Sequence, residues 1–268
     1  MDKFLYGCIY LSAAIAVSVL LMIICYVTVR GIGSVSLEFL TTVTSARKGT
    51  VGIAGNIVNT LYIIVITLVI ATPIGVGSAI YLNEYAKPGK IVRIIEFTTE
   101  TLSGIPSIVY GLFGMLFFTK TLKMGYSMMS GACTLAIMIL PLIMRTAEEA
   151  LKSVPDSYRE ASFGLGAGKL RTIFKIVLPS AVPGILSGVI LATGRVVGET
   201  AALLFTAGTI AKVAGLMDSG RTLAVHMYAL SSEGLYMNQM YATGVILMLI
   251  VLLINGCSGM IAKKIAKK

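Results

Sequence analysis

The feature that most constrains this chain is a series of apolar runs, each long enough to cross a membrane. One of them, LYIIVITLVIATPIGVGSAIYL, is almost uninterrupted from residue 61 to residue 82. A helix needs roughly 20 residues to cross about 30 Å of hydrocarbon. Strands of membrane barrels are shorter, about 10 residues, and alternate between apolar and polar positions. The runs therefore predict an all-α integral membrane protein.

Composition supports a single transmembrane domain over residues 1–268. Hydrophobic residues make up 56% of the chain and charged residues only 13%, whereas soluble proteins carry about 25% charged residues. The first apolar run exceeds the roughly 7 to 15 residues of a signal peptide core, and no small-residue cleavage site follows it, so we expect a retained N-terminal helix. Six transmembrane helices are expected, at about 6–29, 56–82, 92–119, 127–146, 180–206 and 241–262.

The net charge of +10 is explained by membrane orientation. With the N-terminus inside, seven basic residues fall outside, Arg195 falls within a span, and fourteen fall inside, as the positive-inside rule requires. The inside set is Lys3, Lys87, Lys90, Arg93, Arg145, Lys152, Arg159, Lys169, Arg171, Lys175, Lys263, Lys264, Lys267 and Lys268. We therefore expect a multi-pass protein of the plasma or inner membrane with both termini cytoplasmic. Its basic residues would meet lipid headgroups. The sequence has no basic face interleaved with aromatic residues, so nucleic-acid binding is not predicted.

Cysteine and histidine usage argues against a metal site and against an enzyme. Cys8, Cys25, Cys133 and Cys257 all lie in expected spans and form no CxxC pair. His226 is the only histidine, so no site with two imidazoles can form, and we expect an ordinary loop or interface residue. A membrane hydrolase would need a nucleophile with a base, or a metal set, within the spans. The sequence predicts neither.

The longest inside segment, about 147–179, has helical order of its own. Ser153 and Pro155 are helix start signals, and the glycines between 164 and 168 are stop signals. A second, amphipathic helix is expected before Pro179 and Pro183 open the next span. Its apolar side consists of Leu170, Ile173, Phe174 and Val177. Such a segment is either a docking element for another protein or an interfacial helix on lipid.

The stretch GLGAGKL within this loop is not a phosphate-binding P-loop. The pattern G-x-x-x-x-G-K-[ST], anchored on Gly168 and Lys169, requires Gly at 163 and Ser or Thr at 170. The chain has Phe163 and Leu170 at those positions. We therefore expect no cofactor bound by this chain, and any ATP would be used by a separate subunit.

The loop resembles the EAA loop of ABC importer permeases, whose pattern is E-A-A-x3-G-x9-I-x-L-P. The spacing agrees at every anchored position, and Ser162 is a small-for-small departure from the third Ala. The resemblance implies a type I ABC importer permease fold, in which the loop is a cytoplasmic coupling helix seated in a groove of the ATPase. The implied ATPase-coupling residues are Glu160, Ala161, Ser162, Gly166, Ala167, Ile176, Leu178 and Pro179.

Two further stretches, 100–114 and 188–208, resemble phosphate permeases of the PstA type. With the EAA loop, the resemblance covers a core region of about 52–262, and it implies import of inorganic phosphate, with this chain forming half of the translocation path. The implied partners are a second permease similar to PstC, an ATPase dimer similar to PstB and an external phosphate-binding protein similar to PstS. Permeases for molybdate, tungstate or sulfate share the loop and are the alternative.

Arg195 and Glu199 are the charged candidates for the translocation path. They are four residues apart, so a continuous helix would place them on one face, and charges within the bilayer must face protein or water. An internal ion pair that fixes helix packing and an arginine that meets the transported anion are both compatible with this spacing. In the second role Glu199 would orient Arg195 or limit its grip on the anion. The resemblance favours this role, because it implies that an Arg and a Glu of this segment serve phosphate passage.

The stretch SGIPSIVYG supplies the polar candidates Ser103, Ser107 and Tyr110. Glycine and proline within a span are tolerated where protein or water satisfies the freed backbone groups. These residues would line the path at the interface with a second permease, or would serve close helix packing. Glu96 and Glu100 lie four residues apart near the same span's cytoplasmic end, with Arg93 as the local countercharge or with a lining role of their own.

Overall fold

The computed structural model describes residues 2–45 and 49–266; Arg47, Lys48, Lys267 and Lys268, which entered the charge count, lie outside the described residues. The described chain is nearly all helical, and five helices are long and apolar enough to cross a membrane. They are α1 (Asp2–Gly31), α3 (Ala54–Ile80) continued by the π-helical turn η2 (Tyr81–Tyr85), α6 (Met128–Lys152), the segment Lys169–Val197, and α12 (Met237–Ala266).

The expected span at 92–119 is two helices rather than one. α4 (Lys90–Ser103) and α5 (Ser107–Gly114), the latter continued by η3 (Met115–Thr121), meet at an angle of 103°. Pro106 precedes α5 directly, and a proline lacks the N–H that would continue the hydrogen-bond ladder. The prediction of one continuous helix is therefore wrong, and six spans are reached only if this bent pair counts as one.

The expected span at 180–206 differs at both ends. α8 (Lys169–Thr172) and η4 (Ile173–Val177) run without a break into α9 (Leu178–Val197), so the predicted second amphipathic helix is the first part of the span. Pro179 and Pro183 lie within the helical segment instead of opening it. At the other end the helix stops at Val197, and α10 (Ala201–Thr206) begins after a short break.

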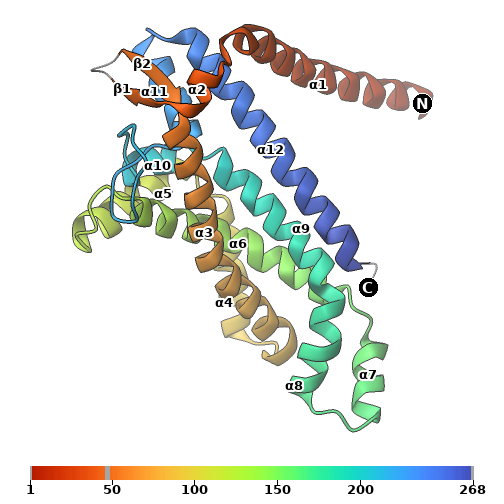
Figure 1. The fold of residues 1–268 in the computed structure, drawn as a ribbon. Helices are drawn as coiled ribbons and strands as arrows, with labels where there is room; N and C mark the ends of the chain where they lie inside the picture. The colour runs from red at the N-terminus through yellow and green to blue at the C-terminus, as the bar shows by residue number, and fades with distance from the viewer. Residues whose placement is uncertain (1, 46–48, 267–268) are drawn as a thin grey trace.

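Small elements gather at the two ends of the helix assembly (Figure 1). One end, called here the cap end, carries α2 (Leu37–Thr41), the antiparallel hairpin β1 (Val43–Ser45) and β2 (Thr50–Ile53), and α11 (Leu223–Glu233). The opposite end, called the loop end, carries α7 (Asp156–Gly164) and α8. The hairpin is the departure from an all-helical fold.

The core of the assembly is the packing of α6 between α3 and α9, with α12 along α9 (Figure 1). Small residues allow the close approach: a Cβ on Gly75 would lie 2.8 Å from Cγ2 of Ile143, and one on Gly188 would lie 2.6 Å from Cβ of Thr146. α1 diverges from this core and meets α12 near the cap end, where Tyr26 and Tyr241 stack edge to face. α3, α6 and α9 therefore form the closely packed frame of the molecule.

Asn59 fastens the loop between α10 and α11 to the beginning of α3. Its side-chain nitrogen donates to the backbone oxygens of Lys212, at 2.8 Å, and Arg221, at 3.1 Å. Its side-chain oxygen accepts a hydrogen bond from the backbone N–H of Ala214 at 3.0 Å. All three hydrogen bonds of Asn59 join segments far apart in sequence, so the cap end is tied directly to a membrane-spanning helix.

His226 was expected in a loop or interface, and it lies instead fully buried in α11. Neither ring nitrogen has a hydrogen-bonding partner within the described residues. Burial, and secondarily the nearby positive charge of Arg221, lower the pKa of His226 to about 3. The imidazole is therefore neutral at physiological pH and packs as part of the cap-end core.

Replacing Gly188 by Ala should lower the free energy of unfolding by about 1–3 kcal/mol, the usual cost of overpacking. The added methyl group would collide with Thr146 on α6 and push apart two helices of the frame. Gly194→Ala is the matched control on the same helix, because its Cβ would meet nothing within 4 Å. Thermal unfolding in detergent measures both variants, and equal melting temperatures would contradict the described packing.

Candidate functional site

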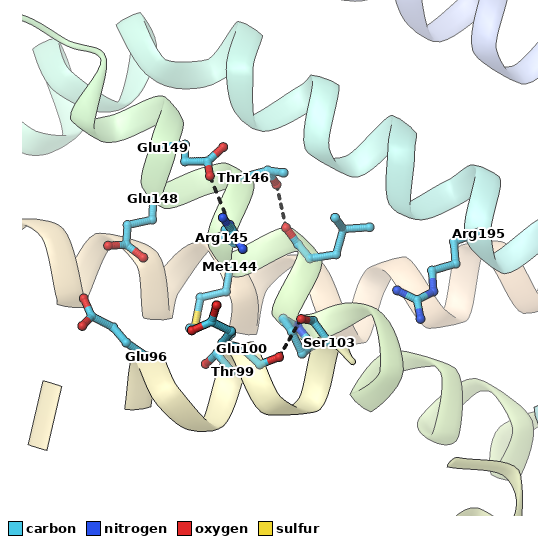
Figure 2. Close-up of a pocket in the computed structure, with 12 residues that line it drawn as sticks. Glu96, Thr99, Glu100, Ser103, Met144, Arg145, Thr146, Glu148, Glu149 and Arg195 are labelled. Atoms are coloured by element: carbon cyan, nitrogen blue, oxygen red, sulfur yellow. Dashed lines mark hydrogen bonds and ion pairs between the residues drawn. The ribbon is translucent and has the colours of Figure 1, made fainter. Parts of the chain in front are cut away.

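A polar cavity of about 470 Å³ lies between α4, α6 and α9 (Figure 2). Its lining combines four carboxylates and two guanidinium groups with the hydroxyls of Thr99, Ser103 and Thr146. The charged lining residues are Glu96, Glu100, Arg145, Glu148, Glu149 and Arg195. Among the described residues, no group of three or more His, Cys, Asp or Glu side chains has the geometry to hold a metal ion. The cavity is thus a charged, hydroxyl-bearing space.

The two arginines of the cavity have different surroundings. Arg145 Nε donates to Glu149 Oε1 at 3.2 Å, within one turn of α6. Arg195 comes from α9 and points into the cavity from the opposite side (Figure 2). No carboxylate of the described residues lies within ion-pair distance of Arg195. Its guanidinium is therefore the positive group of this cavity that is available to an anion.

Glu199 is not the partner of Arg195, and the prediction that they share one helix face is wrong. α9 ends at Val197, so Glu199 lies in the break before α10. Its carboxylate is buried and accepts a hydrogen bond from the backbone N–H of Ala202 at 3.0 Å. This contact satisfies a backbone donor at the start of α10, as capping residues do. Glu199 therefore stabilises the short non-helical segment between α9 and α10, and it does not line the cavity.

The three hydroxyl-bearing candidates on α4 and α5 do not all line the cavity. Ser103 lines the cavity at the end of α4, whereas Ser107 begins α5 outside it. Tyr110 is buried, and its hydroxyl donates to the backbone oxygen of Leu102 at 2.7 Å, across the bend. A Cβ on Gly111 would lie 2.8 Å from the backbone of Ala202 on α10. Close packing is thus the described role of Tyr110 and Gly111, and Ser103 joins Arg195 in the cavity.

The sequence interpretation missed the contribution of α6 to this cavity. Arg145, Glu148 and Glu149 were placed at or beyond the end of a span, where charges are ordinary. Their spacing with Lys152 gives two ion pairs at i,i+4, Arg145–Glu149 and Glu148–Lys152, a recognisable sign of a continuing helix. α6 indeed runs to Lys152 and brings these charges alongside α4.

The second candidate region is the loop 147–179, whose first helix forms as predicted. α7 begins directly after Pro155 and ends at Gly164. Gly166 has a positive φ of 81°, a left-handed conformation that glycine adopts at little cost. The backbone N–H of Ala167 donates to the carbonyl of Ser162 at 3.1 Å. The turn therefore closes the end of α7 and sends the chain into α8.

Ser162, the departure from the EAA pattern, has a contact that the sequence interpretation did not anticipate. Its hydroxyl is buried and lies 2.8 Å from the hydroxyl of Thr172 on α8. This hydrogen bond joins the two helices of the loop. Of the other predicted coupling residues, Glu160, Ala161, Gly166 and Pro179 are exposed, while Ala167, Ile176 and Leu178 are partly buried.

The turn between α7 and α8 projects beyond the frame of spanning helices (Figure 1). Large apolar side chains are exposed around it. Leu165, at the tip, is 90% exposed. The exposed set is Tyr158, Phe163, Leu165, Leu170 and Phe174. An apolar cluster at a projecting tip is typical of a surface that another protein or a membrane covers.

Arg159 anchors α7 to the end of α3. Its Nη2 lies 2.7 Å from Oε1 of Glu84, and its Nε donates to Oε2 of the same carboxylate at 3.4 Å. Nη1 also donates to the backbone oxygen of Val154 and bonds Asp156. The Glu84 carboxylate raises the pKa of Arg159 above its usual range. The loop is therefore fixed to the spanning frame by a mostly buried ion pair.

Spanning helices that enclose a charged cavity, together with a projecting helical loop fixed to their ends, define the class of membrane transport permeases. The family comparison agrees. Residues 71–267 match the model of the family described as "Binding-protein-dependent transport system inner membrane component". The chain belongs to this family, and it is an ABC transporter permease.

Curated relatives carry related descriptions. The chain is 37% identical over 248 residues to the "Probable ABC transporter permease protein YqgI" of Bacillus subtilis, covering 87% of this chain and 84% of that protein. It is 31% identical over 257 residues to the "Phosphate transport system permease protein PstA" of Haemophilus influenzae, covering 95% of this chain and 91% of that protein. The protein of the same description from Yersinia pestis is 35% identical, with 84% and 78% covered.

Solved structures share the fold at low sequence identity. A bacterial alginate ABC transporter, described in complex with an alginate-bound periplasmic protein, aligns with a TM-score of 0.72 at 13% identity, covering 100% of this chain and 96% of that chain. The MetNI methionine ABC transporter aligns with a TM-score of 0.62 at 20% identity, with 80% and 94% covered. The fold is therefore that of type I ABC importer permeases.

Proposed function

We propose that this chain is the permease subunit of an ATP-driven importer of inorganic phosphate and forms half of the translocation path. The observation that carries the proposal is Arg195, a guanidinium in a spanning helix that faces a polar cavity without a paired carboxylate. A guanidinium presents a planar set of donors that matches phosphate oxygens. The phosphate permeases among the relatives support this cargo.

The remaining charges of the cavity suit release of the anion. Glu96 and Glu100 on α4 face the same space as Arg195. A lone cation in a medium of low dielectric would hold a divalent anion too tightly for transport. Carboxylates beside it lower its net attraction, so the cavity takes the role that the sequence interpretation gave to Glu199.

The exposure of the cavity supports a second permease subunit. The side chains of Arg145 and Glu149 are 67% and 65% exposed. Charges that face hydrocarbon are costly, so this side of the helix assembly needs protein or water against it. A second permease would cover it and complete the path.

The apolar tip around Leu165 supports docking of a separate ATPase dimer, which would hydrolyse the ATP. The match to the EAA pattern and the relation to complete ABC importers favour this occupant over lipid. We place the loop end on the cytoplasmic side, and we keep the expectation that both chain termini are cytoplasmic, because the positive-inside distribution of Lys and Arg favours it. An external phosphate-binding protein would deliver the anion at the cap end, and the whole chain would act as one membrane domain.

The alternative cargo is another oxyanion, because arginine binds molybdate, tungstate or sulfate by the same geometry. The related permease from Bacillus subtilis carries no cargo in its name. Uptake of labelled phosphate in the presence of excess molybdate, tungstate or sulfate separates these cargos. We expect unlabelled phosphate to compete fully and the other oxyanions to compete weakly. Strong competition by any of them would contradict phosphate as the preferred cargo.

Replacing Arg195 by Gln should reduce phosphate uptake by about tenfold or more, because a charge-assisted hydrogen bond contributes roughly 1.5–3 kcal/mol. Arg195→Lys keeps the charge and should retain part of the activity. Copurification of the partner subunits measures assembly, which we expect to persist in both variants. Full uptake by the Gln variant would reduce Arg195 to a packing role.

Replacing Gly166 by Ala should impair ATPase binding or uncouple ATP hydrolysis from uptake. The left-handed conformation at this position costs a residue with a Cβ roughly 1–2 kcal/mol, so the turn would change shape. Gly168→Ala is the matched control, since Gly168 has a φ of −74° and open space around it. ATPase copurification and the ratio of uptake to hydrolysis measure the effect. Equal behaviour of the two variants would discredit the turn as a coupling element.

A further inference from the structure

The ion pair between Arg159 and Glu84 is unlike the other ion pairs of the described chain. The side chains are 16% and 7% exposed, whereas each of the other ion pairs has at least one partner more than half exposed. Glu84 also accepts a hydrogen bond from the side chain of Asn83 at 2.8 Å. Arg159 Nη2 donates in addition to the backbone oxygen of Leu151 at 3.2 Å. Arg159 is thus held from several directions in a fixed geometry.

The carboxylate partner lies at the end of the helix that spans the whole frame. α3 with η2 runs for 32 residues, from Ala54 to Tyr85, which corresponds to about 48 Å at 1.5 Å per residue. Glu84 is next to the end of this helix at the loop end. Asn59, which fastens the loop between α10 and α11, is in its second turn at the cap end. One helix therefore connects α7 to the opposite end of the molecule.

We propose that the Arg159–Glu84 pair is the rigid link that transmits movement of α7 to α3, and through α3 to the loop between α10 and α11. The inference rests on the proposed function, because the movement would come from the ATPase dimer. A fork of guanidinium hydrogen bonds fixes direction as well as distance, and this pair joins α7 directly to the end of the helix formed by α3 and η2. Arg159 and Glu84 are positioning residues for transport, since neither lies in the polar cavity.

Spin labels at Tyr158 on α7 and Tyr81 on η2 test the link directly, because both side chains are exposed. The labels are placed in a variant without native cysteines. Pulsed electron paramagnetic resonance spectroscopy then measures the distribution of distances between them in lipid nanodiscs. We expect one narrow distribution with the native pair. Glu84→Gln and Arg159→Gln should each broaden it, although each leaves one group of the pair without its partner. The double variant removes both charges, leaves no unpaired buried charge and should therefore fold while showing the same broadening.

Uptake of labelled phosphate and ATP hydrolysis by the assembled transporter provide the second measurement. Each single variant should lower uptake per ATP by roughly twofold to thirtyfold, the range of coupling changes seen for positions along such networks. The double variant should be no worse than either single one, because all three remove the same contact. Asp156→Asn is the matched control: Asp156 is 87% exposed and contacts the same guanidinium, and its loss should change uptake by less than about twofold.

The two measurements distinguish failure of the Arg159–Glu84 link from failure of the proposed phosphate import. A narrow label distribution in the double variant, or effects of the single variants that add in the double variant, would overturn the link. If the native transporter takes up no phosphate, the proposed function fails, and the label distances still decide whether the pair fixes α7 to α3. Arg159→Lys keeps the charge without the fork, so we expect a distribution of intermediate width.

Discussion

The structure depends on one constraint: within hydrocarbon, every backbone polar group needs a partner inside the protein. Continuous helices meet it along α3, α6 and α12. The two breaks in the membrane region meet it with side chains. The Tyr110 hydroxyl donates across the bend between α4 and α5, and the Glu199 carboxylate accepts from the N–H of Ala202 at the start of α10. Buried polar side chains thus stabilise both helix breaks. The charged cavity lies beside the bend between α4 and α5.

The same constraint relates the cavity to the loop. Charged groups of α4, α6 and α9 cannot face lipid without a large cost, so they converge on one polar space. Charges nearer the loop end are paired, as Arg159 is with Glu84. In the spanning frame between them, glycines bring α6 into close contact with α3 and α9. Close packing of whole helices makes the attachment of α7 to the end of α3 a direct mechanical connection between the loop and the frame.

The sequence predicted the elements set by local chemistry. The long apolar runs predicted most of the spans, and Pro155 predicted the start of α7. The residue spacing around Gly166 indicated the family. The bend at Pro106 and the continuation of α6 to Lys152 had local signs that the sequence interpretation did not use, whereas the end of α9 at Val197 had none. A four-residue spacing placed Glu199 beside Arg195 only on the assumption of an unbroken helix. The partnership of Arg159 with Glu84 joins residues 75 positions apart, and the sequence carries no local sign of it.

In the proposed transporter, the loop between α6 and α9 receives force from a separate ATPase. A photoreactive side chain placed at Glu160 or Ala167, in membranes that contain the assembled transporter, shows which molecule lies against this loop. We expect covalent adducts with the ATPase subunit at both positions, and none at Leu253, which is exposed along α12. Adducts with lipid alone at Glu160 and Ala167 would contradict it.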